Sequence, residues 1–298
     1  RMSLESTIIC EESTIEQSGD TSKKRNFSFI RPKVDYRFDI TPSLQLRATI
    51  EKDVAQLSFN DFTANIAPNN DEDKNTFAGN PEIKQEQSWR YDLNLEYRFD
   101  NDNGVINTNL YYQDLEDLID RIDVSTPTLI QSANGNIGDG ERHGGSIDTS
   151  YRLASFNLPQ MLITARVDAI ESQATDPFLN IRRPIQRQGK GSYRYGFRYD
   201  MGSQNISYGV NFFGTFDGDQ IVYDIDKTED YEMDDFIMAF LEIQGWGGLI
   251  YRFEATNPHE QYQCRIRTRY SSGTIATGSL SEIEDTCSHA GEKYAIKI

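Results

Sequence analysis

The chain has 298 residues, 37% of them hydrophobic and 11% aromatic, and it carries a formal net charge of −17. This acidic balance excludes a nucleic-acid-binding surface, because phosphate contacts need a basic stripe and the arginines here are scattered singly. Its 16 tyrosines and 16 phenylalanines argue against a disordered chain, and no apolar run approaches the roughly 20 residues of a membrane-spanning helix.

Apolar and polar residues alternate with a period of two along most of the chain. This period places successive side chains on opposite faces of a strand, whereas a helix would scatter them around its circumference. The clearest segments, in chain order, are 44–51, 90–99, 145–153, 161–169, 193–200 and 249–255. Counting hairpins from a first strand near 2–12 to a last one at 292–298 predicts an all-β chain of about twelve strands.

Short and long connections take turns between these strands. Short turn signals occur at 41–43, 100–104, 155–160, 201–205 and 244–248, and long polar connections are predicted at 60–86, 123–139, 172–190, 217–235 and 271–291. Aromatic residues accompany every short turn, namely Phe38, Phe99, Tyr151, Tyr199 and Trp246. Such rings settle at the level of lipid headgroups, so an antiparallel up-and-down transmembrane β-barrel is predicted.

Charged residues occupy the other face of these strands, deep within each segment. An arginine or lysine facing lipid at mid-depth costs about 2 to 4 kcal/mol, so this face is expected to line a wet or filled interior. A small barrel has no room for so many charged side chains, which favours a wide one. The arginines predicted to face this lumen are Arg47, Arg90, Arg98, Arg152, Arg194, Arg198 and Arg252.

Several segments resemble the barrel domain of TonB-dependent outer-membrane receptors. The likeness begins in residues 27–62 and 79–99, continues through 104–122 and 134–153, and ends in 245–273. The residues that carry it are Pro32, Arg47, Gly79, Asn80, Pro81, Lys84, Glu86, Asn257 and Pro258. Each motif is short, and their combination over nearly the whole chain makes the resemblance specific.

The resemblance implies that residues 1–298 form the C-terminal portion of a barrel of about 22 strands. It implies an outer-membrane receptor, not an enzyme, that takes up a scarce metal chelate, cofactor or oligosaccharide with TonB-coupled energy. Its expected partners are outer-membrane lipid, its own plug domain, the TonB complex and the ligand. Because plug, TonB box, signal peptide and a terminal aromatic residue are not found between Arg1 and Ile298, truncation at both ends is expected.

Two interpretations of the lumen arginines stay open. They pair with neighbouring carboxylates such as Asp92, Glu96, Asp148 and Glu254, or they contact the plug or an anionic ligand. Ligand contacts are also predicted for loop residues, namely Phe77, Phe178, Arg182, Arg183 and Tyr223. The acidic connection at 217–235 is interpreted as a solvated loop, with a divalent cation as the alternative.

Cysteine and histidine spacing supports no metal site, no cofactor and no catalytic constellation. Cys264 and Cys287 flank the last long connection on the predicted extracellular side, and a disulfide between them is one of two open interpretations. Two other classes of protein also remain open: a passive outer-membrane porin, and a soluble extracellular carbohydrate-binding β-protein.

Overall fold

A computed structural model describes residues 2–17, 23–57, 76–216, 220–257 and 261–298. One large antiparallel sheet dominates this part of the chain, and its main path holds twelve strands. In spatial order they are β1 (Met2–Gln17), β2 (Lys23–Asp39), β3 (Leu44–Val54), β5 (Gln87–Arg98), β6 (Gly104–Glu116), β9 (Gly140–Arg152), β10 (Met161–Thr175), β12 (Gly191–Met201), β13 (Ile206–Thr215), β16 (Phe236–Gln244), β17 (Ile250–Thr256) and β20 (Lys293–Lys297).

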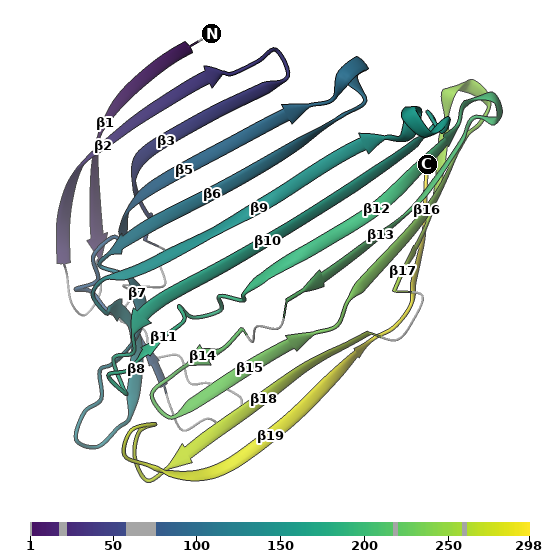
Figure 1. The fold of residues 1–298 in the computed structure, drawn as a ribbon. Helices are drawn as coiled ribbons and strands as arrows, with labels where there is room; N and C mark the ends of the chain where they lie inside the picture. The colour runs from purple at the N-terminus through teal and green to yellow at the C-terminus, as the bar shows by residue number, and fades with distance from the viewer. Residues whose placement is uncertain (1, 18–22, 58–75, 217–219, 258–260) are drawn as a thin grey trace.

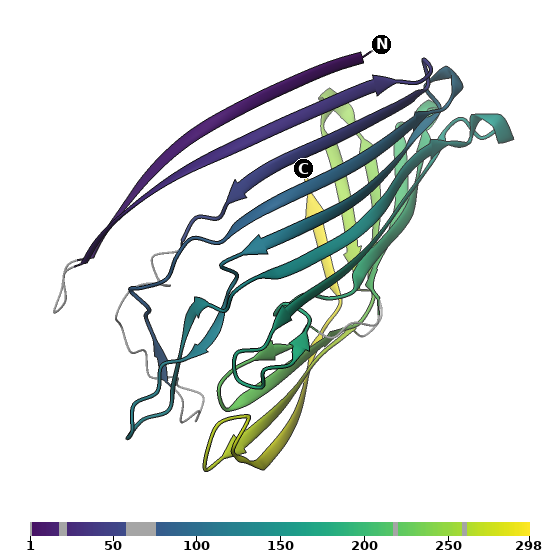
Figure 2. The ribbon, with the colours of Figure 1, turned by 60° about the vertical axis from the view of Figure 1, so that its left-hand side comes forward.

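The large sheet forms a curved wall of long, tilted strands (Figures 1 and 2). Its edges are β1 and β20, which do not pair with each other, so the barrel is not closed. The predictions of an all-β antiparallel barrel wall and of about twelve strands are confirmed. Among the described residues, no helix is long and apolar enough to cross a membrane.

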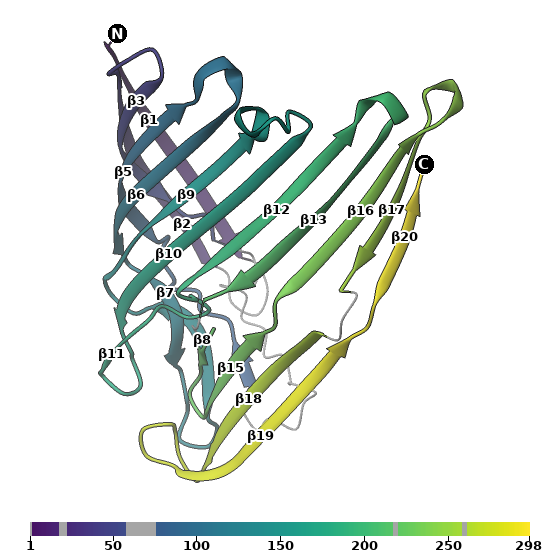
Figure 3. The ribbon, with the colours of Figure 1, turned by 45° about the vertical axis from the view of Figure 1, so that its right-hand side comes forward.

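All the short turns lie at one end of the wall (Figure 3). Four of them contain a 3-10 helix, namely η1 (Asp100–Asp102), η2 (Leu153–Phe156), η3 (Gly202–Gln204) and η4 (Trp246–Gly248). Each of these turns contains an Asn or Gly in the left-handed region, with φ of 57° at Asn101, 59° at Asn157, 54° at Asn205 and 74° at Gly247. Asn and Gly tolerate this conformation, which explains why the chain reverses there.

The two faces of the wall differ as the alternation predicts. Strand register aligns Leu95, Thr108, Ile147 and Val167 across one face, and Glu96, Asn107, Asp148 and Arg166 across the other. Many apolar side chains of the first face are open to the surroundings, with exposed fractions of 56% for Leu110 and 53% for Ile147. A wall whose apolar residues point outward and whose charges point inward fits lipid outside and water or protein inside.

Aromatic rings gather at two levels of the outward face. Near the short turns, Phe99 contacts Tyr97 and Tyr151 at centroid distances of 5.2 and 4.7 Å. Farther along the strands, Tyr91 contacts Tyr112 at 6.3 Å. The second level was not predicted, because its rings are remote from any turn signal. The apolar band lies between the two levels, as in the aromatic girdles of membrane barrels. The side chain of Trp246 lies outside the described part.

Two smaller sheets occupy the end of the wall opposite the short turns (Figure 1). One contains β14 (Val222–Tyr223), β15 (Lys227–Met233), β18 (Gln261–Ser271) and β19 (Ser279–Ala290). The other contains β4 (Thr76–Ala78), β7 (Ile119–Asp123) and β8 (Gln131–Asn136). We call these two sheets, together with residues 176–190, the outer cap.

The outer cap corrects the predicted long connections. Within 217–235 lies β15, within 271–291 lies β19, and within 123–139 lies β8. The strands of the cap lack an apolar face because they lie beyond the lipid band. Apolar and polar residues therefore do not alternate along them, and the sequence pattern did not reveal them as strands. β1 also runs to Gln17, beyond the predicted end near residue 12. Most of the predicted connection at 60–86 lies outside the described residues.

The buried apolar cluster lies beneath the outer cap and not inside the wall. It joins Leu115, Leu118, Ala174 and Ile185, with Ile137 packed against it. The wall thus does not enclose an apolar core, whereas the two sheets of a soluble β-sandwich pack around one. This cluster instead packs the cap onto the ends of β6 and β10.

Candidate functional site

The predicted lumen arginines all lie on the inward face, and each has a carboxylate neighbour. Four pair along their own strand, with N···O distances of 2.7 Å for Arg90 to Asp92, 2.5 Å for Arg98 to Glu96, 2.8 Å for Arg198 to Asp200 and 2.5 Å for Arg252 to Glu254. Arg47 pairs with Asp35 of the neighbouring strand β2. Residues two apart share a face, so pairs along a strand form as readily here as the pairs between strands that the sequence interpretation named.

Arg152, Arg194 and Arg198 form links across several strands. The Arg194 guanidinium lies 3.5 Å from a carboxylate oxygen of Asp148, two strands away, and Arg166 of the intervening strand lies 3.9 Å from the same oxygen. The sequence analysis did not include Arg166 among the lumen arginines, although the alternation along its strand places it on the same face as they are. Arg166 and Arg194 border a recess of about 640 Å³, whose lining includes the aromatic pair Phe213 and Phe236.

A second charged row crosses the wall nearer to the short turns. Arg198 contacts Asp200 at 2.8 Å and Glu242 at 2.7 Å, and Arg152 approaches Asp200 at 4.0 Å. Arg252 contacts both Glu242 and Glu254, and Glu254 in turn contacts Lys297 of β20 at 2.6 Å. Exposed pairs of this kind contribute little stability each. Their effect is to hold a polar lining in a defined geometry.

The loop candidates Arg182 and Arg183 point to opposite sides of the wall. They form β11, which pairs with the end of β10, so alternation separates their side chains. Arg182 is 69% exposed and lies 3.8 Å from Glu141. Arg183 is 4% exposed and contacts Asp176 at 2.6 Å and Asp120 at 2.8 Å. The Arg183 guanidinium is therefore held by two carboxylates inside the protein, and ligand contact by Arg182 or Arg183 stays a prediction.

Arg183 joins three parts of the outer cap. Asp120 comes from β7, Asp176 from the end of β10, and the ring of Tyr223 in β14 lies 4.2 Å from the guanidinium carbon. Burial raises the pKa of Asp120, against the attraction of Arg183, and the nearby Asp176 raises it further. Two buried carboxylates share one cation here, so loss of the guanidinium would leave both carboxylates buried without their partner.

The remaining predicted loop contacts are divided. Tyr223 is half-buried against Arg183, and Phe178 is half-buried in a turn closed by its N–H donating to Asp176 at 2.9 Å. Phe77 lies in β4, but its side chain lies outside the described part. Ligand contact by Tyr223 or Phe178 stays a prediction.

The acidic connection forms part of a structured sheet. Asp217 and Asp219 lie outside the described residues, whereas Glu229 of β15 contacts Arg267 at 2.6 Å. Burial opposes ionisation of Glu229, yet hydrogen bonds from Tyr231 and Arg267 leave its pKa below the usual value. In the described part of the chain, no group of three or more His, Cys, Asp or Glu residues is arranged to hold a metal ion.

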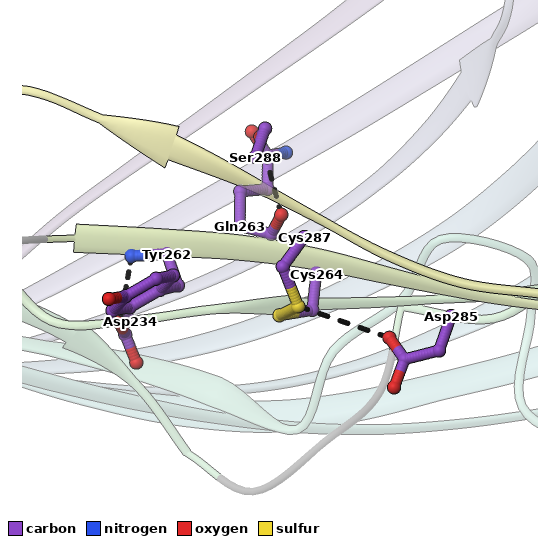
Figure 4. Close-up of a disulfide and its surroundings, with 7 residues drawn as sticks. All are labelled: Asp234, Tyr262, Gln263, Cys264, Asp285, Cys287 and Ser288. Carbon is purple, nitrogen blue, oxygen red and sulfur yellow. Dashed lines mark hydrogen bonds between the residues drawn. A yellow bond between two sulfur atoms is a disulfide. The ribbon is translucent and has the colours of Figure 1, made fainter.

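Cys264 and Cys287 lie directly opposite each other in the hairpin of β18 and β19 and form a disulfide (Figure 4). Two hydrogen bonds support this end of the hairpin: Ser288 donates to the Gln263 carbonyl at 3.3 Å, and the Tyr262 N–H donates to Asp234 at 2.8 Å. Cys10 is a free, exposed cysteine of β1. The two cysteines are 23 residues apart in the sequence, and it is the register of β18 and β19 that brings their sulfurs together.

Replacing both Cys264 and Cys287 with serine is expected to loosen the outer part of the β18 and β19 hairpin. A crosslink over a loop of this length contributes about 3 kcal/mol by restricting the open chain. Hydrogen exchange of residues 265–286 measures the effect, and Cys10→Ser is the control without change. Unaltered exchange in the double variant would mean that strand pairing alone holds the hairpin.

The fold and its charged lining define an outer-membrane type of barrel wall. The family model described as "TonB dependent receptor-like, beta-barrel" matches residues 12–234. The chain belongs to this family, whose members are outer-membrane transporters and not enzymes, and it is an outer-membrane protein.

Two solved structures show the same fold. "Copper transporter OprC" aligns with a TM-score of 0.64 at 14% identity, covering 86% of this chain and 39% of that one. The siderophore receptor PirA from Acinetobacter baumannii aligns with a TM-score of 0.54 at 10% identity, covering 85% of this chain and 39% of that one. The chain thus spans about two fifths of the length of these structures. No curated protein matches the sequence.

Proposed function

We propose that this chain is the C-terminal portion of the barrel of a receptor that takes up a scarce ligand with TonB-coupled energy. The observation that carries the proposal is the two-faced wall in a chain of this family, apolar toward lipid and lined with ordered charges toward the lumen. A metal chelate, a cofactor or an oligosaccharide is the proposed class of ligand. In the whole receptor, a plug domain and the TonB complex are the proposed partners.

The outer cap supports the receptor function over free diffusion. Its parts are tied to one another by the Arg183 contacts and by a hydrogen bond from Gln186 to the Tyr223 carbonyl at 2.6 Å. Such a structured rim offers a fixed surface to a ligand, because ordered loops lose little conformational entropy on binding.

Ligand uptake in cells that lack the gene tests the function. The panel consists of copper and iron chelates, a corrinoid and short oligosaccharides, of which copper and a siderophore appear in the names of the two similar structures. We expect growth on one limiting ligand to require both this gene and TonB. Uptake that needs the gene but continues without TonB would identify a passive porin instead.

A further inference from the structure

One arginine of the inward face differs from the others in its surroundings. Every other inward-facing arginine from β3 to β17 has a carboxylate oxygen within 4.0 Å; these are Arg47, Arg90, Arg98, Arg152, Arg166, Arg194, Arg198 and Arg252. Arg142 of β9 has neither an ion pair nor a hydrogen bond from its guanidinium to any described residue, and its Nε is buried without a partner.

The surroundings of Arg142 give its guanidinium no direct ion pair among the described residues. The Arg142 charge acts on Glu86 and on Tyr111, and Tyr111 in turn lies against Arg90. The Glu86 carboxylate accepts the Ile119 N–H at 3.2 Å, and burial raises the pKa of Glu86, which weakens its negative charge. Asp92, the next carboxylate along the wall, is engaged by Arg90 through two hydrogen bonds of 2.7 and 2.9 Å.

Tyr111 supplies a second polar group beside Arg142. Gly144 lies opposite Tyr111, and a Cβ there would lie 3.0 Å from the Tyr111 hydroxyl, so the ring lies across the bare glycine. The Arg90 guanidinium lies 4.4 Å from the centroid of the same ring and holds its other side. The hydroxyl is a donor for an anion that reaches Arg142.

Arg142 lies at the end of the wall that adjoins the outer cap. Its sequence neighbours Glu141 and His143 face outward and are polar, whereas the apolar band ends at the level of Tyr112, which pairs with His143. Arg142 pairs in register with Ser172 of β10, whose hydroxyl accepts the N–H of Ile185 in the outer cap at 3.1 Å. A guanidinium binds carboxylate and phosphate oxygens in a bidentate manner, more strongly than it binds neutral groups.

We propose that Arg142, with the Tyr111 hydroxyl beside it, binds an anionic oxygen group of the ligand, a carboxylate or a phosphate. The inference rests on the proposed receptor function for the statement that this group belongs to a transported molecule. The cation itself is a property of the wall and is tested without transport.

The test is modification by phenylglyoxal, which reacts with accessible guanidinium groups, on the full-length protein purified from outer membranes. We expect citrate and inorganic phosphate to slow modification of Arg142 about tenfold, and glucose to leave it unchanged. Arg194, which is 57% exposed and near Asp148, is the internal reference and should keep its rate. Protection by phosphate but not by citrate, or the reverse, identifies which oxygen group the site prefers.

Two results would overturn the proposal: modification of Arg142 that no anion slows, or a guanidinium that stays unreactive because another part of the protein covers it. Arg142→Gln should abolish citrate binding measured by calorimetry, whereas Arg194→Gln should preserve it. Both variants should reach the outer membrane in normal amounts. If anion protection holds but no ligand uptake depends on the gene, the receptor function fails while the anion site stands.

Discussion

Replacing Leu110 with arginine is expected to reduce assembly of the barrel severely. Leu110 is 56% exposed on the outward face of β6, between the two aromatic levels, where it faces lipid. A guanidinium at this depth costs about 2 to 4 kcal/mol, because lipid offers it neither water nor a counter-ion. The free energy of unfolding in lipid vesicles, together with the amount of folded protein in outer membranes, measures the loss.

Asn107→Arg is the matched control on the same strand. Asn107 faces inward between Glu96 and Asp148, so the same side chain meets water and two carboxylates there. We expect its stability to stay within about 0.5 kcal/mol of the parent. Equal losses in the two variants would contradict the assignment of lipid to one face and the lumen to the other.

Replacing Arg183 with alanine is expected to open the outer cap. The change leaves the carboxylates of Asp120 and Asp176, which are 2% and 1% exposed, without their cation. Removing one partner of a buried ion pair costs about 3 to 5 kcal/mol. Hydrogen exchange of β7 and of residues 176–181 should accelerate accordingly, while the strands of the wall keep their protection.

The neighbouring variant Arg182→Ala tests the specificity of this effect. Arg182 is 69% exposed, so its loss should change the same exchange rates little. The Arg183→Ala defect should also shrink as the pH falls, because a carboxyl whose pKa is raised by burial gains stability when it takes up a proton. A defect that grows on acidification would show that the two carboxylates are not its cause.

The alternation of side chains made most of the wall predictable. The phase of each strand placed Leu95 and Tyr97 on one face and Arg90 and Arg98 on the other, as the structure has them, because a pleated strand has only two faces. The short turns were equally predictable, because four of them contain an Asn or Gly that adopts the left-handed conformation. The strands of the outer cap were not predictable, because they face no lipid and apolar residues do not alternate along them.

The sequence by itself determined a lipid-facing barrel wall, its strand number and the family to which it belongs. Only the tertiary structure decided which charges are satisfied. Arg182 and Arg183 are adjacent and chemically alike, yet one is exposed and the other is buried between Asp120 and Asp176. The same holds for Arg142, which faces the same side as the paired arginines but lies opposite Gln113 and Ser172 and not opposite a carboxylate. Ion pairing depends on distances across the sheet, and strand register sets these distances only after folding.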